Sequence, residues 1–335
     1  LFIRKDLKQP PITGNDELAL AFYLLKFELN SWLISKGGVM LTTFDDIISS
    51  AKGSRKRNLA VADAAGDSVV EALAEAEKMG IIKPFLIGEK EKIEPLVEKY
   101  KLTDYEIISA GSPEEIAEKT VELAATGKCD MLMKGKLSTP ILLKAVLDKE
   151  KGLRTGNLLS HVAVMEVENY PKLIIMSDGG MNIRPDVKQK AQILGNAGMV
   201  AEKFGAEKPK AVGLAAIEVI NPDMPETGEF AMLTKMSERG QLGNIIFEGP
   251  LAIDVVLSGD AAQAKKIDTA MSEDADIFLV PDIASGNIFA KSLIYLADAK
   301  IGGVVMGAKL PIVLLSRSDT AETKLNSIAL GCVIS

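Results

Sequence analysis

The stretch Asp276-Ile-Phe-Leu-Val-Pro-Asp282-Ile-Ala-Ser285-Gly286-Asn287-Ile288 shows on a small scale how this chain is built. Residues 277–280 form a short apolar run with branched side chains, which is typical of a strand covered on both faces. A Pro-Asp pair ends the run, and small and hydroxyl-bearing residues follow at once. Similar runs recur along the chain and predict strands at 59–62, 85–87, 131–133, 162–165, 173–176, 211–215, 277–280, 304–306 and 312–315.

Helical segments lie between these runs, and several have recognisable starts. Ser112-Pro113-Glu114-Glu115 supplies an N-cap residue, a first-turn proline and early carboxylates for one helix. Thr139-Pro140 begins another, and Asp319 with Glu322 has the spacing of a capping box. Strands that alternate with helices over short links predict right-handed βαβ units and therefore a doubly wound parallel α/β sheet.

Length and composition narrow the class of protein. The chain has 335 residues, a length that favours about two domains. It is 47% apolar and 25% charged, as expected of a globular chain with a sizeable core. The net charge of −7 argues against nucleic acid as a main partner, because binding to its backbone needs a clustered basic surface. The two cysteines are far apart and lack CxxC spacing, which predicts no disulfide framework or zinc site and fits a reducing cytoplasm.

Residues 1–39 carry one short apolar stretch, 18–25, which Lys26 and Glu28 end and which is too short to span a bilayer. We therefore expect no membrane span. Met40 opens a segment that reads like an ordinary protein start, and the preceding Lys36-Gly37-Gly38 has codons that can spell a bacterial ribosome-binding site. We expect residues 1–39 to be a non-native extension translated from upstream sequence; the alternative is an amphipathic helix over 16–33 that docks on the body.

Polar and cationic residues directly follow the predicted strands. Ligands of open α/β sheets bind outside the carboxyl ends of the strands, so these residues are candidates for a binding site. Each alone is typical of a turn or a solvated surface, but hydroxyls, small residues and cations together can form an anion cradle. They favour a site for phosphate or a phosphorylated ligand. The candidates are Lys136, Ser138, Thr139, Asp178, Ser285, Gly286, Asn287, Lys309, Ser316, Arg317 and Asp319.

Other chemistries lack their motifs. The chain has no GxxxxGK[ST], no GxGxxG after a strand, no HExxH and no GxSxG. A Ser-His-Asp hydrolase would have to use His161, the only histidine, which the pattern places at the mouth of a strand. A structural histidine is the favoured interpretation there. Cys129 and Cys332 adjoin apolar segments and are interpreted as core residues rather than nucleophiles.

Four stretches together resemble the phosphate acetyl/butyryl transferase family, over about Met40 to the C-terminus. The stretch at 276–288, with Lys291 a few residues on, resembles the family signature. The other three agree with the family in order and spacing: Glu248-Gly249-Pro250-Leu251 with Asp254, Ser177-Asp178-Gly-Gly-Met-Asn182, and Gly307-Ala-Lys309-Leu-Pro311 through Ser316-Arg317.

Further details resemble the phosphotransbutyrylase branch, which includes enzymes acting on branched acyl-CoAs. The resemblance implies two doubly wound α/β domains with an active-site cleft between them, the architecture of isocitrate and isopropylmalate dehydrogenases. It implies one domain at 40–154 plus 311–335 and the other at 155–310, in homo-oligomers built on a dimer. The stretches that carry the branch are Leu132-Met-Lys134-Gly-Lys136-Leu-Ser138-Thr-Pro140, Leu158-Leu-Ser160-His161 and Leu314-Leu-Ser316-Arg317-Ser-Asp319.

The resemblance also implies roles for single residues. Ser316 and Arg317 match a Ser-Arg pair that acetyl-branch enzymes place beside coenzyme A. Those enzymes have an acidic residue a few positions later, proposed as the base that acts on the thiol. Here the matching position is Thr323, so the base stays open between Asp319 and Glu322, which also suit a capping role.

The implied reaction exchanges a butyryl or branched C4–C5 acyl group between coenzyme A and inorganic phosphate, with no metal or cofactor. Lys144 falls near an arginine of the acetyl branch and joins the candidates for binding. Three alternatives remain: a phosphate acetyltransferase, an NAD-dependent, metal-requiring hydroxy-acid dehydrogenase on the same architecture, and a non-catalytic coenzyme A or nucleotide sensor. The dehydrogenase would need clustered Asp residues and an arginine set for a hydroxy acid, and neither motif is found.

Overall fold

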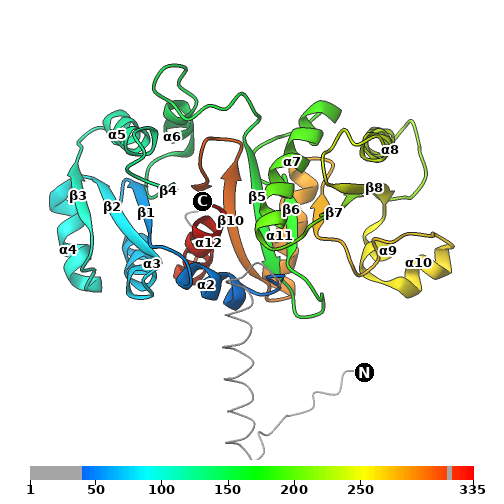
Figure 1. Cartoon of the computed structure of the whole chain (residues 1–335), viewed down its shortest axis with the longest axis horizontal. Helices are drawn as coiled ribbons and strands as arrows, with labels where there is room; N and C mark the ends of the chain where they lie inside the picture. Colours follow the sequence, from blue (N-terminus) through cyan, green and yellow to red (C-terminus); the bar gives the residue numbers. More distant parts are fainter. Residues whose placement is uncertain (1–39, 315–318) are drawn as a thin grey trace, which may run out of the picture.

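The computed structural model describes residues 40–314 and 319–335, so the expected extension at 1–39 lies outside it. One sheet of 11 strands runs through these residues (Figure 1). In spatial order its strands are β3 (Glu106–Ser109), β2 (Ile82–Gly88), β1 (Arg57–Ala62), β4 (Met131–Lys134), β11 (Ile312–Val313), β10 (Lys300–Met306), β5 (Ser160–Glu166), β6 (Ile174–Ser177), β9 (Ile277–Leu279), β7 (Lys210–Leu214) and β8 (Ile246–Leu251). Each predicted strand has a counterpart.

The sheet is mixed rather than wholly parallel, which corrects part of the prediction. β10 is antiparallel to both β11 and β5, and β5 is antiparallel to β6, whereas the other neighbours are parallel. The links at 167–173 and 307–311 are too short for a crossover, which takes a dozen or more residues, so the strands that they join must run antiparallel.

Two strands were not predicted, and both lie at an edge of the sheet. β3 is half-buried and polar at its ends, and β8 contains the Glu-Gly-Pro of the sequence stretch at 248–250. A search for fully apolar runs finds central strands, because edge strands are covered less completely. Proline in β8 suits an edge, where one side of the strand has no partner.

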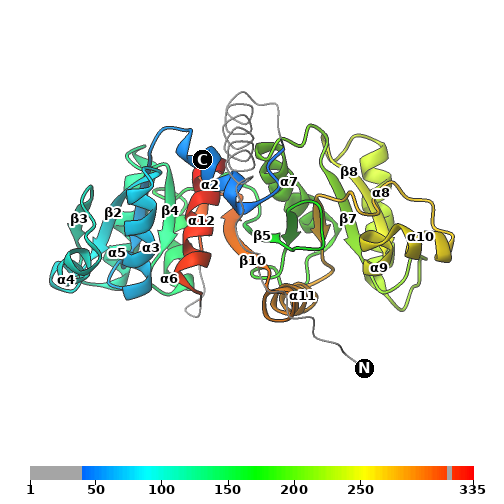
Figure 2. The same ribbon diagram turned by 90° about the horizontal axis from the view of Figure 1, so that it is seen from below.

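Helices cover one face of the sheet with a single apolar core. This core reaches from β1 and β2 through β5 to β7 and β8, and we call this side the continuous face (Figure 2). The helices that supply its side chains are α2 (Phe44–Lys52), α3 (Asp67–Lys78), α4 (Lys90–Tyr100), α7 (Val187–Lys203), α8 (Pro225–Glu238) and α12 (Ala321–Ile334).

The opposite side carries two separate apolar cores, and we call it the divided face. One core lies over β1, β4 and β11, and the other lies over β6, β7 and β9. The helices here are α5 (Pro113–Ala125), α6 (Thr139–Val146), α9 (Ile253–Leu257), α10 (Gly259–Lys265) and α11 (Ile283–Leu296). The predicted starts of α5, capped by Ser112, and of α6 are confirmed. The boundary between the two cores follows β10 and β5.

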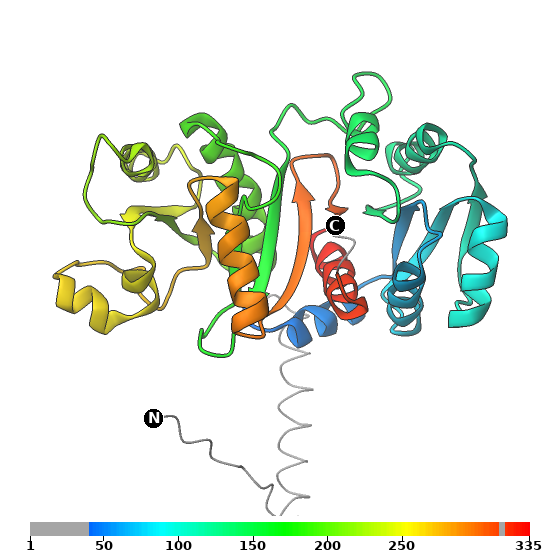
Figure 3. The ribbon, with the colours of Figure 1, turned by 180° about the vertical axis from the view of Figure 1, so that it is seen from behind.

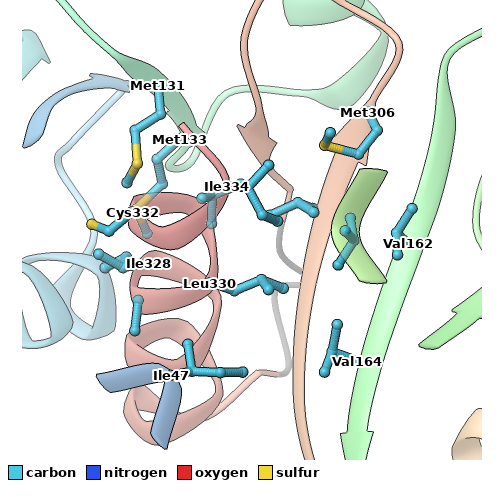
Figure 4. Packing of buried hydrophobic residues seen from close by; sticks show 14 of the residues in the cluster. Ile47, Met131, Met133, Val162, Val164, Met306, Ile328, Leu330, Cys332 and Ile334 are labelled. Carbon is cyan, nitrogen blue, oxygen red and sulfur yellow. The ribbon is translucent and has the colours of Figure 1, made fainter. Parts of the chain in front are cut away.

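α12 supplies a hydrogen-bond acceptor to the part of β10 that the short strand β11 does not reach. The backbone N–H of Gly303 on β10 donates to Ser327 Oγ at 2.9 Å, in place of a further strand. The helix approaches closely because Gly302 has no side chain, and a Cβ there would lie 3.1 Å from the Asn326 carbonyl carbon. Figure 4 shows Ile328 and Leu330 of α12 in the same core as Val162 of β5.

The strands of 40–154 and 311–335 occupy one end of the sheet, and those of 155–310 occupy the other. Hydrogen bonds of the sheet and the core of the continuous face both cross between these two sets, and the division into two domains stays a prediction. Among the described residues, no helix is long and apolar enough to cross a membrane.

Candidate functional site

The candidate site lies on the divided face, along the boundary between its two apolar cores. His161, the second residue of β5, stands there opposite Val305 of β10. Val305 belongs to the core over the first strands, whereas Ala163, two residues further along β5, belongs to the core over the second. We call the polar strip around His161 the seam.

Two glycines make room for the imidazole of His161. A Cβ built on Gly180 would lie 3.0 Å from its Cγ, and a Cβ on Gly303 would lie 2.7 Å from its Nε2. Nδ1 is buried without a hydrogen-bond partner. Burial lowers the pKa of His161, while the nearby carboxylates of Asp178 and Asp319 act in the opposite direction. The two carboxylates belong to different ends of the sheet, so their action on one ring shows that the ends converge at the seam.

Asp178 organises the loop after β6. Its buried carboxylate accepts hydrogen bonds from the backbone N–H groups of Gly180 and Met181 at 2.9 Å, and from those of His161 and Asn182 at 3.2 Å. The Asn182 side-chain amide donates a further bond to it. Met181 packs against the core of the other end of the sheet, so this loop bridges the seam. The carboxylate therefore has a structural use, and its predicted contact with substrate stays a prediction.

The start of α11 lies against the same loop. Asp282 caps the helix by accepting from the backbone N–H of Ser285 at 2.8 Å and from its hydroxyl at 2.9 Å. These bonds, led by the backbone one, hold the pKa of Asp282 below its usual value. Gly286 is buried against Gly179, and a Cβ on it would lie 2.7 Å from that residue's Cα. Ser285 and Gly286 thus fix the helix, and Asn287 beside them is exposed.

The predicted capping box of α12 is wrong. Thr320 is the N-cap, and its hydroxyl accepts from the backbone N–H of Thr323 at 3.1 Å. Asp319 precedes the cap and acts electrostatically on His161. The hydroxyl of Thr320, one residue closer to the helix, takes the capping role, since threonine is also among the preferred N-cap residues. The buried amine of Lys324 holds this turn by donating to the Asp319 carbonyl oxygen.

The side chain of Glu322 lies in a different part of the molecule from His161. It lines a groove of about 700 Å³ between α3, the end of α4 and α12, together with Glu71, Tyr100 and Leu325. The side chains of α3 and α12 belong to the continuous face, away from the seam. Of the two acidic candidates for a base, only Asp319 acts electrostatically on His161.

The predicted lysines take part in none of the ion pairs that join the described residues. Lys136, Lys144 and Lys309 are exposed, and none of them forms an ion pair within the part of the chain that the structure describes. Ser138 stands at the start of α6, where its hydroxyl makes no capping bond, and Thr139 is the first helical residue. Lys291 lies on the outer side of α11, with its Nζ 5.9 Å from the Tyr295 ring centre. Ser316 and Arg317 lie outside the described residues.

Both cysteines are buried and free, as interpreted from the sequence. Burial raises the pKa of each thiol, Cys129 and Cys332, to about 12. The interpretation of His161 as a structural histidine stays a prediction. Nothing in the linear sequence indicates that Gly180 and Gly303 flank its ring, since both lie far from it along the chain.

The mixed α/β fold is shared with solved structures. A branched-chain phosphotransacylase from Enterococcus faecalis V583 superimposes with a TM-score of 0.74 at 31% identity, over 83% of this chain and 99% of that one. A 4-hydroxythreonine-4-phosphate dehydrogenase from Klebsiella pneumoniae, 13% identical, shares the fold with a TM-score of 0.52 over 84% of this chain and 99% of its own. The predicted dehydrogenase-like architecture is therefore confirmed.

Sequence similarity identifies the family. Residues 111–332 match the family described as phosphate acetyl/butaryl transferase. The phosphate butyryltransferase of Clostridium acetobutylicum is 43% identical over 297 residues, 88% of this chain and 99% of the relative. The phosphate acetyltransferase of Thermotoga maritima is 42% identical over 291 residues, 86% of this chain and 98% of the relative. The chain belongs to the phosphate acetyl/butaryl transferase family of acyltransferases, as the sequence stretches predicted.

Proposed function

We propose that this protein transfers a butyryl or branched C4–C5 acyl group from coenzyme A to inorganic phosphate, giving an acyl phosphate and free coenzyme A. The observation that carries the proposal is similarity over 99% of the length of a phosphate butyryltransferase. The fold shared with a branched-chain phosphotransacylase at 31% identity supports it. Membership of an acyltransferase family argues against the dehydrogenase alternative, and the assay described below tests the sensor alternative.

The transfer needs few specialised groups, because a thioester is already activated. A phosphate oxygen attacks the thioester carbonyl carbon, so that a C–O bond forms, the C–S bond breaks, and the coenzyme A thiolate takes up a proton. We assign Ser316 and Arg317 to phosphate and coenzyme A from the family match, since a guanidinium fork suits a phosphoryl group. The unpaired Lys136, Lys144 and Lys309 are available for the anionic groups of coenzyme A.

We assign Asp319, rather than Glu322, as the group that exchanges a proton with the coenzyme A thiol. Asp319 acts on His161 at the seam, whereas Glu322 lines the groove beside α3. The proton that hydrogen phosphate loses on attack passes to the coenzyme A thiolate, with the Asp319 carboxylate as the relay, and it returns the same way in the reverse direction. Asp319→Asn should therefore lower turnover in both directions, whereas Glu322→Gln should leave turnover within about twofold of wild type; the opposite result would reassign the base.

One assay tests the proposed reaction. Thiol release from butyryl-CoA, followed with a thiol reagent, should require phosphate. Butyryl-CoA and isobutyryl-CoA should be preferred over acetyl-CoA by about tenfold in kcat/KM, because each methylene in an apolar pocket is worth roughly 0.8 kcal/mol. Equal kcat/KM for acetyl-CoA would favour the phosphate acetyltransferase alternative, in line with the Thermotoga maritima relative. No thiol release with any acyl-CoA would overturn the proposal.

We further propose that the protein is a homo-oligomer in which a second copy covers the outer side of α11. Figures 2 and 3 show α11 as the outermost element on its side of the sheet, with no other described element over it. Its outward residues Ile288, Tyr295 and Leu296 are 67%, 70% and 85% exposed. Lys291 is the one charged residue among the 14 of this helix. A helix that is apolar on both sides is normally buried on both.

The oligomer proposal is tested by sedimentation. Wild type should sediment as a dimer or a multiple of it, and the double change Ile288→Glu with Leu296→Glu should release monomers. The matched control is Leu257→Glu on α9, whose side chain is also exposed, at 41%, and which should leave the oligomer intact. A wild-type monomer, or a control that dissociates equally, would contradict the assignment of this surface. We also propose that the protein acts in the cytoplasm, which the two free cysteines support.

A further inference from the structure

Lys324 carries a buried charge that the stability of the fold does not explain. It is 3% exposed and is the fourth residue of α12, where its Nζ donates to the backbone carbonyl oxygen of Asp319. A cation at this place is opposed by burial and by the positive end of the helix dipole. It forms no ion pair with any described residue. Thr320 already caps the helix, so α12 can begin without this amine.

α7 begins in the same way and supplies a comparison. Lys190 is the fourth residue of α7, and its Nζ likewise donates to the carbonyl oxygen of the residue before the N-cap, Pro185, at 2.7 Å. The amine of Lys190 is also buried, but it forms an ion pair with Glu229 at 2.6 Å. The two helix starts therefore share one hydrogen bond. Of their two charges, only that of Lys190 has an ion-pair partner within the described residues.

The charge of Lys324 acts on the residue that precedes the N-cap of α12. Burial lowers the pKa of Lys324, and the carboxylates of Asp319 and Glu71 oppose this effect. Glu71 lies on α3 and lines the groove there, whereas Asp319 is the proposed proton relay. Lys324 therefore holds Asp319 at two points, its carbonyl oxygen by a hydrogen bond and its carboxylate by electrostatic attraction. The corresponding residue of α7 is Pro185, which has no carboxylate to hold.

We propose that Lys324 is a positioning residue of the proposed reaction, which fixes Asp319 for the transfer of a proton to the coenzyme A thiolate. The inference rests on the proposed function and deepens it. A relay carboxylate must lie within hydrogen-bond reach of the groups that exchange the proton, and a displacement of about 1 Å can cost about 10²-fold in rate. Lys324 itself contacts no substrate in this scheme, because its amine is buried and bound to Asp319.

Two methionine variants test the proposal, because they should respond in opposite ways. Lys324→Met removes the charge and keeps an unbranched side chain. Its kcat for butyryl transfer should fall by about 10- to 10²-fold, with KM for butyryl-CoA and for phosphate within about threefold. Its Tm should stay at the wild-type value or rise, because an apolar group replaces a buried charge that has no ion pair.

The matched control is Lys190→Met. This change leaves the carboxylate of Glu229 without its partner, so it should lower Tm. Its effect on kcat should be smaller than that of Lys324→Met, because Lys190 holds no residue that exchanges a proton.

A double variant tests whether Lys324 acts through Asp319. In an Asp319→Asn background the carboxylate is gone, so Lys324→Met should change kcat by less than about twofold, whereas two independent defects would multiply. Lys324→Gln keeps N–H donors without the charge and should give a kcat between those of wild type and Lys324→Met. It replaces the methionine variant if that variant does not fold.

Three outcomes would overturn the proposal. The first is a wild-type kcat in Lys324→Met, or in Lys324→Gln where the methionine variant does not fold. The second is a full further loss of kcat when Lys324→Met is added to Asp319→Asn, which would show that Lys324 acts by another route. The third is a fall in Tm as large as that of Lys190→Met, which would give the amine the structural use that it has in α7.

The measurements separate this inference from the proposed function. Phosphate-dependent thiol release by wild type supports the proposed function whatever the variants do, and a wild-type kcat in Lys324→Met then rejects the role of Lys324 alone. No thiol release by wild type rejects the proposed function and the role of Lys324 with it. The comparison of Tm values needs no turnover, so a structural use of Lys324 is detected in either case.

Discussion

The two faces of the sheet differ in how their apolar cover is arranged. On the continuous face, helices from both ends of the chain share one core that crosses the sheet from β2 to β8. On the divided face, the apolar cover stops on either side of β5 and β10. His161 lies between its two parts, and the carboxylates of Asp178 and Asp319 act electrostatically on its ring. The adjacent residues Gly302 and Gly303 show the contrast directly, because the first makes room for α12 and the second for an imidazole.

This difference indicates that the two faces have different roles, one in stability and the other in turnover. Burial of apolar area on the continuous face holds the two ends of the sheet together and supplies stability. The break on the divided face lowers that gain, but it leaves polar groups from both ends near one another. Changes on the two faces should therefore separate stability from turnover, and the predictions below test that separation.

The largest expected effect on turnover comes from Arg317. Arg317→Ala should lower kcat/KM for butyryl-CoA by about 10²–10³-fold, the scale for losing one transition-state donor, because the guanidinium is assigned to a phosphoryl group. Arg317→Lys should recover part of the activity, since lysine keeps the charge but loses the planar fork. The melting temperature should change little, because surface ion pairs of arginine are worth about 0–1 kcal/mol. Wild-type kinetics in Arg317→Ala would contradict this assignment and make Lys136 and Lys309 the next candidates for binding the phosphoryl group.

The largest expected effect on stability comes from the continuous face. Leu73→Ala in α3 removes a fully buried side chain of the shared core and should cost about 2–5 kcal/mol of unfolding free energy. The turnover of the folded fraction should stay near wild type. Leu257→Ala makes the same chemical change at a side chain that is 41% exposed and serves as the control. A large loss of kcat in Leu73→Ala at a temperature where it is folded would break the proposed separation of the faces.

The sequence predicted the parts of this fold that depend on local chemistry. Central strands appeared as apolar runs, and α5 began at Ser112 as its capping pattern indicated. The edge strands β3 and β8 were missed because incomplete cover leaves them without an apolar run. The antiparallel directions of β5 and β10 were readable from the short links beside them, but a pattern of alternating strands and helices favoured a parallel sheet.

The site was less predictable, because it depends on contacts between distant segments. The carboxyl-end rule found Asp319 and the start of α11, yet it could not separate Asp319 from Glu322, which lie three residues apart and face different sides. It assigned Gly286 to ligand binding, which stays a prediction, and the structure also gives Gly286 a packing role against Gly179. The seam itself is a property of two cores and has no signature in any single stretch.

A smaller effect on stability is expected from a change in pH. The folded-state pKa of His161 lies below its ordinary value of 6.5, because burial opposes the charge more than Asp178 and Asp319 support it. Below about pH 6.5 the unfolded chain therefore binds a proton that the folded chain resists, and stability falls as the pH drops towards the folded pKa. The melting temperature of wild type should decline across this window more steeply than that of His161→Gln, which has no group to titrate there. Parallel curves would show that the ring is not held neutral.

The smallest expected effect comes from the cysteines, and it bears on the chemistry of the seam. Changing both Cys129 and Cys332 to Ser should leave kcat within about twofold, because thiols with pKa values of about 12 hold almost no thiolate at neutral pH. Stability should fall modestly, since each hydroxyl enters an apolar core. Direct attack of phosphate on the thioester then needs no acyl-enzyme. The check is to incubate wild type with labelled butyryl-CoA in the absence of phosphate and to measure the label that remains on the denatured chain. Label that stays on wild type and disappears from the double variant would establish a covalent route through a cysteine and contradict direct attack of phosphate on the thioester.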